Sequence, residues 1–458
     1  MMFNRLLLVS IISTTLLCGC FNKNKKNTSS SEEEEVKDYI DEADYEYENK
    51  LPEPSNVVHN MDQLSHLVDY HAFYKDKKSF EVQIADDYVY STSKKTVDSE
   101  INYLYWYGEL VNGVMGIKGT AKSETEWTIE FKFYHDAYID AKPNKVMLKN
   151  LAYGEHAQTR ADNYDNFTTN ANSGRTVIDV ATSQQLWYAV EWGYAVKPIA
   201  DSPAEKYYNL AKDVLRKNID DSMDNYQKTI AIYDYIEHNA TYCYEALEAP
   251  EASDPKNYPD EICARYKAFY LEGFFDNKTV VCDGFSKVYT LLGRMEGLNI
   301  YRGSGTSDKS WKSKEVAGHA YCYVEIDDKY YLSCPTWGQS NVNNYASNKQ
   351  VLNKNYFLSP RDYISPYTGT DWPSLNYATG VNNIRYFQER TFESGGTHST
   401  YITSSLEFNA VTSALTSSSG CFLDLYFSSV SLKDNFISSL GSIKYLTSGY
   451  LEVICYKE

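Results

Sequence analysis

The chain is best interpreted from the stretch Thr279-Val-Val-Cys282-Asp-Gly-Phe-Ser-Lys-Val-Tyr-Thr-Leu-Leu-Gly-Arg-Met-Glu-Gly-Leu298. Its apolar residues recur with helical spacing after Cys282, and Gly297 is a typical helix end. A thiol in the first turn of a helix lies near unpaired amides and the positive end of the helix dipole, and both lower a cysteine's pKa. The pattern therefore predicts a helix that begins at Cys282 and a cysteine suited to nucleophilic attack.

After a loop rich in Gly, Ser and Lys, the chain continues as Gly318-His319-Ala-Tyr-Cys-Tyr-Val-Glu-Ile-Asp-Asp-Lys-Tyr-Tyr-Leu-Ser-Cys334-Pro-Thr-Trp337. The Asp-Asp pair between two β-forming runs predicts a hairpin with a two-residue turn. In that register Ile326 faces Lys329, and Cys334 shares a sheet face with His319. His319 is the only histidine between Asn239 and Gln350 in the sequence, so it is the candidate base for Cys282.

These segments resemble the transglutaminase-like core of bacterial lipoproteins, a papain-like cysteine fold. The resemblance covers about 180–375 and rests on five motifs: Val-Cys282-Asp-Gly, Glu-Gly-Leu298, Gly318-His319-Ala-Tyr, Asp-Asp-Lys-Tyr-Tyr and Pro-Thr-Trp337. It implies an α+β fold, in which a papain-like transglutaminase core of a helical part plus an antiparallel sheet is flanked by smaller α+β domains. The family usually has an aspartate that hydrogen-bonds the histidine three residues before the tryptophan, and here that residue is Cys334.

The residues predict a cysteine-dependent acyl transferase or amide hydrolase, and the resemblance implies an enzyme of transglutaminase-like or cysteine-peptidase-like type. Cys282 would attack an amide carbonyl, His319 would shuttle the proton, and an amine or water would resolve the thioester. The substrate would be a protein or peptide, and a cell-wall peptide is one alternative that the sequence leaves open.

Cys334 raises two further interpretations, because a neutral thiol is a poor acceptor for an imidazole N–H. The first is a catalytically degenerate domain that serves as a surface binding or scaffold module. The second is that Cys282, His319 and Cys334 form a regulatory disulfide or bind a soft metal such as zinc.

The N-terminus predicts export. Arg5 precedes an apolar run from Leu6 to Leu17, which is too short to span a bilayer and is typical of a secretory signal. The run ends in Leu17-Cys18-Gly19-Cys20, which resembles the bacterial lipobox. This resemblance implies that Cys20 is lipidated and anchors the chain to the outer face of the bacterial cytoplasmic membrane. The alternative is a soluble secreted chain in which Cys20 has no such role.

Residues 21–55 are polar and then acidic, and they predict a disordered tether. Ten acidic residues against the single Lys37 between Glu32 and Glu48 give −9 of the chain's formal −18. The remainder is mildly acidic and has no basic stripe, so nucleic acid is not expected as a partner. The sequence also contains no Gly-rich phosphate loop and no acidic calcium loop, so no cofactor is expected.

The predicted organisation is a signal peptide at 1–20, the tether at 21–55, an N-terminal α+β domain at 56–176, the transglutaminase-like domain at 177–375 and a small C-terminal α/β domain at 376–458. Capping residues predict helix starts near Asn60, Thr182, Ser202, Asp224 and Ser404. Both flanking domains show a helix-turn-strand order. They are either similar modules or an ordinary α/β unit that arose twice.

Overall fold

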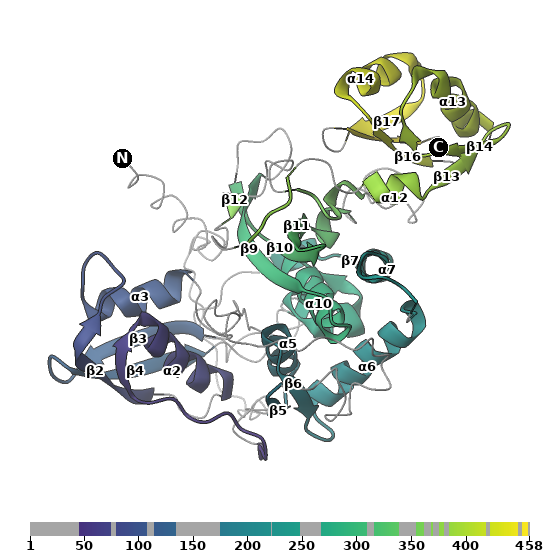
Figure 1. The fold of residues 1–458 in the computed structure, drawn as a ribbon. Helices are drawn as coiled ribbons and strands as arrows, with labels where there is room; N and C mark the ends of the chain where they lie inside the picture. The colour runs from purple at the N-terminus through teal and green to yellow at the C-terminus, as the bar shows by residue number, and fades with distance from the viewer. Residues whose placement is uncertain are drawn as a thin grey trace, which may run out of the picture. The chain divides into compact units, whose positions relative to one another are not determined.

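The computed structural model describes residues 45–74, 79–107, 114–133, 175–220, 222–247, 267–308, 316–338, 354–360, 368–369, 375–379, 384–417, 422–447 and 451–456 (Figure 1). They form two compact units. The first unit comprises Met1–Ser222 and Cys243–Gly297, and the second comprises Met223–Tyr242 and Leu298–Glu458. These units interleave in sequence, whereas the predicted domains are consecutive, so the predicted domain boundaries stay a prediction.

The first unit begins with an N-terminal module of mixed helices and strands. Its elements are β1 (Val57–Asn60), α2 (Met61–Tyr74), β2 (Ser79–Val89), α3 (Val97–Tyr107), β3 (Val114–Ala121) and β4 (Glu126–Phe133). The strands form one sheet in the order β1-β2-β4-β3, with β1 parallel to β2 and the other pairs antiparallel. Buried and exposed residues alternate at the start of β2, with Phe80, Val82 and Ile84 facing the core.

The rest of the first unit is mainly helical. It contains β5 (Val177–Val180), α5 (Ser183–Trp192), β6 (Ala195–Pro198), α6 (Pro203–Asn218), α8 (Tyr244–Leu247), η4 (Lys267–Phe269), η5 (Gly273–Asn277), β8 (Thr279–Val280) and α10 (Cys282–Met295). Thr182 and Ser202 cap α5 and α6 as predicted, each accepting a hydrogen bond from the backbone N–H three residues on. The helix predicted at Cys282 also begins at that residue.

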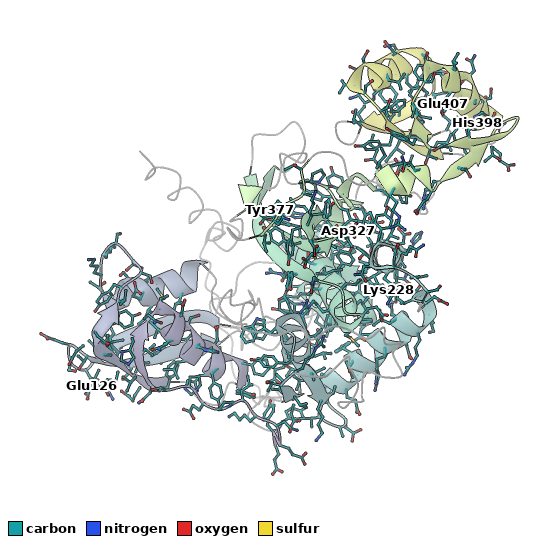
Figure 2. All side chains as sticks on the ribbon, in the orientation of Figure 1. Glu126, Lys228, Asp327, Tyr377, His398 and Glu407 are labelled. Carbon is teal, nitrogen blue, oxygen red and sulfur yellow. The ribbon has the colours of Figure 1, made fainter. Side chains whose placement is uncertain are left out.

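The second unit is built on an antiparallel sheet of strand order β11-β10-β9-β12. Its elements before the C-terminal module are α7 (Asn225–Asn239), β7 (Thr241–Tyr242), β9 (Ile300–Asp308), β10 (Val316–Ile326), β11 (Lys329–Ser333), η6 (Lys354–Tyr356) and β12 (Thr368–Gly369). The hairpin register has Ile326 opposite Lys329, as predicted. Asp327, labelled in Figure 2, and Asp328 form the turn with φ of 52° and 62°, the left-handed conformation that tight hairpin turns require.

The second unit ends with a C-terminal module. It comprises α12 (Ile384–Gln388), β13 (Thr391–Glu393), β14 (Thr397–Ser399), β15 (Tyr401–Ile402), η7 (Ser405–Glu407), α13 (Phe408–Ser417), β16 (Phe422–Phe427), α14 (Val430–Ser439), β17 (Lys444–Thr447) and β18 (Glu452–Tyr456). Ser404 caps the predicted helix start and forms a capping box with Glu407. Leu425, Phe427, Val453 and Cys455 pack with residues of α13 and α14 in a single core.

The two modules share one topology. From β15 onward, apart from the short η7, the C-terminal module follows the order strand, helix, strand, helix, strand, strand, which is also the order of the N-terminal module. The sheet orders β1-β2-β4-β3 and β15-β16-β18-β17 are equivalent, and in each sheet only the first pair is parallel. This agreement favours the interpretation that the flanking domains are similar modules. Helices together with largely antiparallel sheets confirm the predicted α+β class.

The predicted tether extends too far toward the folded chain. Residues 45–54, which we call the strap, contact other parts of the first unit: the Asn49 backbone N–H donates to Asp179 Oδ2 at 2.7 Å, and the Leu51 N–H donates to Tyr74 Oη at 2.9 Å. The composition of the strap gave no sign of these contacts, because they are hydrogen bonds to side chains distant in sequence.

Residues 1–44 lie outside the described residues, so the signal peptide and Cys20 remain predictions. Within the described part of the chain, no helix combines the length and apolar character that crossing a membrane requires.

Candidate active site

Cys282 is the first residue of α10, in the first unit. Every other residue of this helix is buried, whereas Cys282 is partly exposed. The preceding residue, Val281, has an extended backbone (φ −94°, ψ −179°) and no side-chain group that hydrogen-bonds the amides of the first turn. These amides and the helix dipole favour negative charge at the position of the Cys282 sulfur, whether on a thiolate or on an oxyanion beside it.

The two residues after Cys282 have structural roles. The Asp283 carboxylate pairs with Lys287 Nζ at 2.7 Å, and both side chains are almost fully buried. The Lys287 ammonium also lies 4.4 Å from the Tyr270 ring centre. A Cβ atom at Gly284 would overlap the Ala268 carbonyl oxygen. Asp283 and Gly284 therefore fix the start of the helix by ion pairing and close packing, which leaves Cys282 as the reactive candidate.

His319 and Cys334 meet in the second unit. His319 Nε2 lies 3.1 Å from Cys334 Sγ, and the two residues are 8% and 0% exposed. The imidazole stacks on Trp337, with ring centres 5.0 Å apart and planes at 26°. Position 334 therefore lies where the hairpin register places the group that orients the imidazole, and that group is a thiol.

The protonation state of His319 follows from its burial. Burial lowers the pKa of the imidazole to about 3, so His319 is neutral at physiological pH. A carboxylate at position 334 would stabilise the imidazolium, and the Cys334 thiol does not. His319 therefore rests as a neutral imidazole, and a resting thiolate–imidazolium pair is disfavoured.

The backbone of Cys334 is fixed by three hydrogen bonds. Its N–H donates to the Tyr356 carbonyl at 2.8 Å, and its carbonyl accepts from Tyr233 Oη at 3.0 Å and from the Gly338 N–H at 3.1 Å. Because Tyr233 lies on α7, this helix holds in place the strand end that positions the thiol beside His319.

A buried charged cluster lies next to this strand end. Lys354 Nζ pairs with Asp234 and lies 3.0 Å from Glu237 Oε2. The Lys354 and Glu237 side chains are 0% exposed, and Asp234 is 33% exposed. A Cβ atom at Gly338 would overlap Glu237 Oε1, so the cluster packs directly against the segment that follows Cys334. We call Asp234, Glu237 and Lys354 the Lys354 cluster.

The Lys354 cluster was not predicted from the sequence. Glu237 lies three residues after Asp234 and four residues after Tyr233, so its side chain lies beside both on the helix. The sequence signal for the cluster was this pair of acidic residues among apolar ones. Their cationic partner lies 117 residues from Glu237 in the sequence, and no local pattern connects the two.

The Lys354 cluster contains two carboxylates and one cation. Burial raises the pKa of Glu237 to about 8, despite the nearby ammonium. For Lys354, the two carboxylates outweigh burial and raise the ammonium's pKa. At neutral pH, Lys354 therefore stays charged opposite the more exposed Asp234, and Glu237 retains its proton.

Stability is expected to fall as the pH rises from about 4.5 to about 8. In this window Glu237 is ionised in the unfolded chain and protonated in the folded one, so folding takes up a proton and is opposed as protons become scarce. Glu237→Gln should reduce the dependence of stability on pH in this window, measured as the urea midpoint at several pH values. Glu389→Gln, at an exposed carboxylate beside Arg385, is the matched control and should leave the slope unchanged. Equal slopes in wild type and Glu237→Gln would contradict the assignment.

The structure brings His319 and Cys334 together, whereas Cys282 belongs to the other unit. The two units are not placed relative to each other, so the pairing of Cys282 with His319 stays a prediction. Among the described residues, no group of three or more His, Cys, Asp or Glu side chains is arranged to hold a metal ion. The zinc interpretation therefore gains no support from the described residues within either unit.

Comparison with known proteins gives limited similarity. No family model matches the chain, and no curated protein matches it. Among solved structures, a protein described as a TGase (transglutaminase) is 15% identical, with 59% of this chain and 52% of that chain covered and a TM-score of 0.23. A "putative cysteine protease" from Cytophaga hutchinsonii is 11% identical, with 48% and 61% covered and a TM-score of 0.20.

The chain thus spans about half to three-fifths of the length of these two structures. Superposition scores at this level do not define a shared fold, so the function has to be argued from the residues of the site.

Proposed function

We propose that the chain carries a transglutaminase-like cysteine domain that acts on amide bonds of protein or peptide substrates, with Cys282 as nucleophile and His319 as base. One observation carries the proposal: Cys282, at the N-terminus of α10, is the one residue of this helix that is not buried. The backbone amides of the first turn beside it receive no hydrogen bond from the Val281 side chain. The second unit supplies a buried imidazole held in a fixed orientation by Trp337 and Cys334.

The proposed reaction proceeds through a thioester. Because His319 Nε2 faces Cys334, the proton of the Cys282 thiol would pass to Nδ1 as the sulfur attacks the amide carbonyl. The C–N bond then breaks, and the departing amine takes the proton from the imidazolium. Water or a second amine attacks the thioester, returns a proton through His319 and releases Cys282. The first-turn amides of α10 would stabilise the oxyanion in both halves of the reaction.

A second candidate function is a catalytically degenerate module that binds a partner at the cell surface. Its support is specific: Cys334 occupies the position where the resembled family has an aspartate, and burial lowers the pKa of His319 to about 3. Under either function, we propose that lipidated Cys20 attaches the chain to the outer face of the membrane.

Thiol labelling tests the nucleophile. Iodoacetamide near pH 7 is expected to modify Cys282 at least about tenfold faster than an ordinary exposed thiol, because the helix start raises the thiolate fraction. Mass spectrometry assigns the modified residue. Cys282→Ser should remove the fast phase, whereas Cys322→Ser, at a fully buried cysteine, should preserve it.

Labelling of Cys282 at the ordinary rate would overturn the role of α10 in activation. Rapid labelling without amide turnover on a peptide library would favour the binding module. Turnover that Cys282→Ala abolishes would establish the enzyme.

A further inference from the structure

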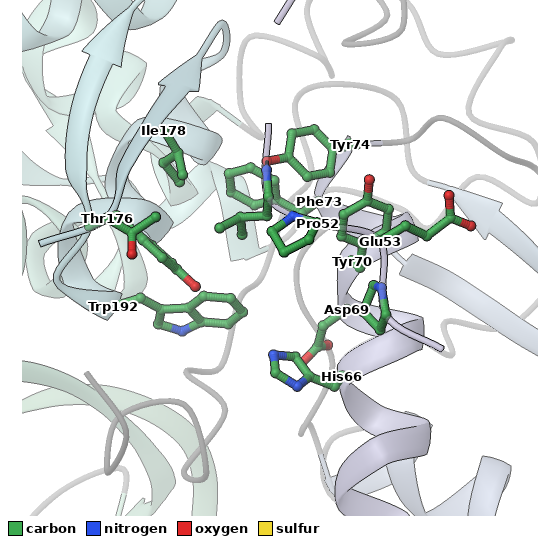
Figure 3. A pocket seen from close by; sticks show the side chains of 13 residues that line it. Pro52, Glu53, His66, Asp69, Tyr70, Phe73, Tyr74, Thr176, Ile178 and Trp192 are labelled. Atoms are coloured by element: carbon green, nitrogen blue, oxygen red, sulfur yellow. Dashed lines mark hydrogen bonds between the residues drawn. The ribbon is translucent and has the colours of Figure 1, made fainter. Parts of the chain in front are cut away.

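A cavity of ≈ 520 Å³ lies in the first unit, apart from α10 (Figure 3). Strap residues 51–54 form one wall, helix α2 forms a second, and Trp192 at the end of α5 forms a third together with Tyr194, which follows the helix. Its volume is within the range of sites that bind small molecules. Nothing in the proposed chemistry of Cys282 uses this cavity.

The walls are largely aromatic. Tyr70, Phe73 and Tyr74 come from α2, and the Trp192 indole lies across from them (Figure 3). Aromatic faces attract cations, and two of these rings already receive one from the chain itself. The Lys50 ammonium of the strap lies 4.5 Å from the Tyr74 ring centre and 5.3 Å from that of Tyr70.

The residues that line the cavity carry negative charge. Glu53 and Asp69 contribute carboxylates, and none of the lining residues is a lysine or arginine. Burial lowers the pKa of His66, the remaining titratable nitrogen base of the lining, so it adds no positive charge at neutral pH. Even with the Lys50 ammonium on the Tyr70 and Tyr74 faces, the two carboxylates leave an excess of negative charge, so the cavity disfavours anions and favours a ligand with positive charge.

One polar group of the lining lacks a partner within the described chain. The Trp192 residue is 3% exposed, and its indole N–H makes no hydrogen bond there. An indole N–H is only a donor, and a buried donor left unsatisfied costs free energy, so an oxygen acceptor on a ligand would be stabilising.

We propose that this cavity binds a small organic cation: a primary amine on an apolar or aromatic body that also carries an oxygen acceptor. The ammonium would lie between the carboxylates and the tyrosine faces, and the body would fill the space beside Trp192. The site is independent of the proposed reaction at Cys282, since its lining residues belong to other elements of the first unit.

Three probes of nearly equal shape test the charge preference. Tyramine is the cation, 4-(2-hydroxyethyl)phenol is its neutral counterpart, and 3-(4-hydroxyphenyl)propionate is its anionic counterpart. In calorimetric titration of the full chain, tyramine is expected to bind with a dissociation constant at least about tenfold lower than that of either counterpart. Equal binding of the three probes, or no tyramine binding, would overturn the proposal.

Two substitutions locate the binding. Glu53→Gln is expected to weaken tyramine binding by about threefold or more, because it removes the charge of a carboxylate that is 50% exposed and lies 3.7 Å from the His71 ring nitrogen. Glu48→Gln, at a strap residue outside the cavity that pairs with Lys197, should leave the affinity unchanged. Equal losses from both variants would place the amine elsewhere.

Lys50→Ala is expected to act in the opposite direction and tighten tyramine binding, because Lys50 competes for the faces of Tyr70 and Tyr74. General damage to the strap would instead weaken binding. A weaker or unchanged affinity in this variant would therefore contradict the placement of the ammonium.

Discussion

Cys334→Asp is expected to raise amide turnover by about 10²- to 10⁴-fold, since removing an orienting carboxylate from a related catalytic triad costs about 10⁴ in rate. The new carboxylate would accept a hydrogen bond from His319 Nε2, which now lies 3.1 Å from the Cys334 sulfur. It would fix the tautomer that presents Nδ1 to Cys282 and stabilise the imidazolium. The pKa of His319 should therefore rise from about 3, measured by NMR titration of the ring.

Cys334→Asn is the matched control, because it offers an oxygen acceptor of similar size without the charge. It should leave the pKa of His319 low and the turnover well below that of the aspartate variant. An unchanged His319 pKa in Cys334→Asp would show that position 334 does not orient the ring. A raised pKa without turnover would favour the binding module.

Lys354→Met is expected to destabilise the second unit by about 3 kcal/mol, the low end of the range for a broken buried ion pair, because it leaves the Asp234 carboxylate without its cation. Asp234 is 33% exposed, and Glu237, which is 0% exposed, is protonated at neutral pH and loses a hydrogen-bond donor. Because the chain has two units, hydrogen exchange in α7 during urea unfolding reports the affected unit directly.

Lys206→Met provides the comparison at an exposed pair. Lys206 lies 2.8 Å from Asp276, with side chains 54% and 36% exposed, and exposed pairs contribute less than about 1 kcal/mol. Lys354→Met combined with Glu237→Gln should remain unstable, because Asp234 still lacks its partner. Equal losses for Lys354→Met and Lys206→Met would show that burial does not govern the Lys354 cluster.

Local signals predicted much of the second unit's geometry. The Asp327-Asp328 turn fixed the hairpin register, and side-chain alternation then placed Cys334 on the face of His319. The spacing of apolar residues and the capping residues also predicted the helix start at Cys282 and the cap at Thr182. Each of these features depends on residues a few positions apart, where backbone geometry restricts the alternatives.

Features that join distant segments were not predicted. The Lys354 cluster brings together residues 117 and 120 positions apart, and the strap meets Asp179 at a separation of 130. No periodicity encodes such contacts, because many tertiary arrangements satisfy the same helix and strand patterns. For the same reason the pairing of Cys282 with His319 rests on chemistry and resemblance.

The shared topology of the two modules has a consequence for how their sequences diverged. Aligning the parallel pairs β1–β2 and β15–β16 makes Glu81 equivalent to Asp424 and Glu126 to Glu452. Glu81 is 53% exposed and pairs with Lys122, whereas Asp424 and Glu452 are 6% and 0% exposed. Acidic residues thus occupy the same two positions in both modules, facing water in one and protein in the other. A chimaera carrying the N-terminal module in the C-terminal place would keep the strand pairs in register and put glutamates where Asp424 and Glu452 now lie, so neither strand register nor the acidic character of these positions would distinguish the two modules.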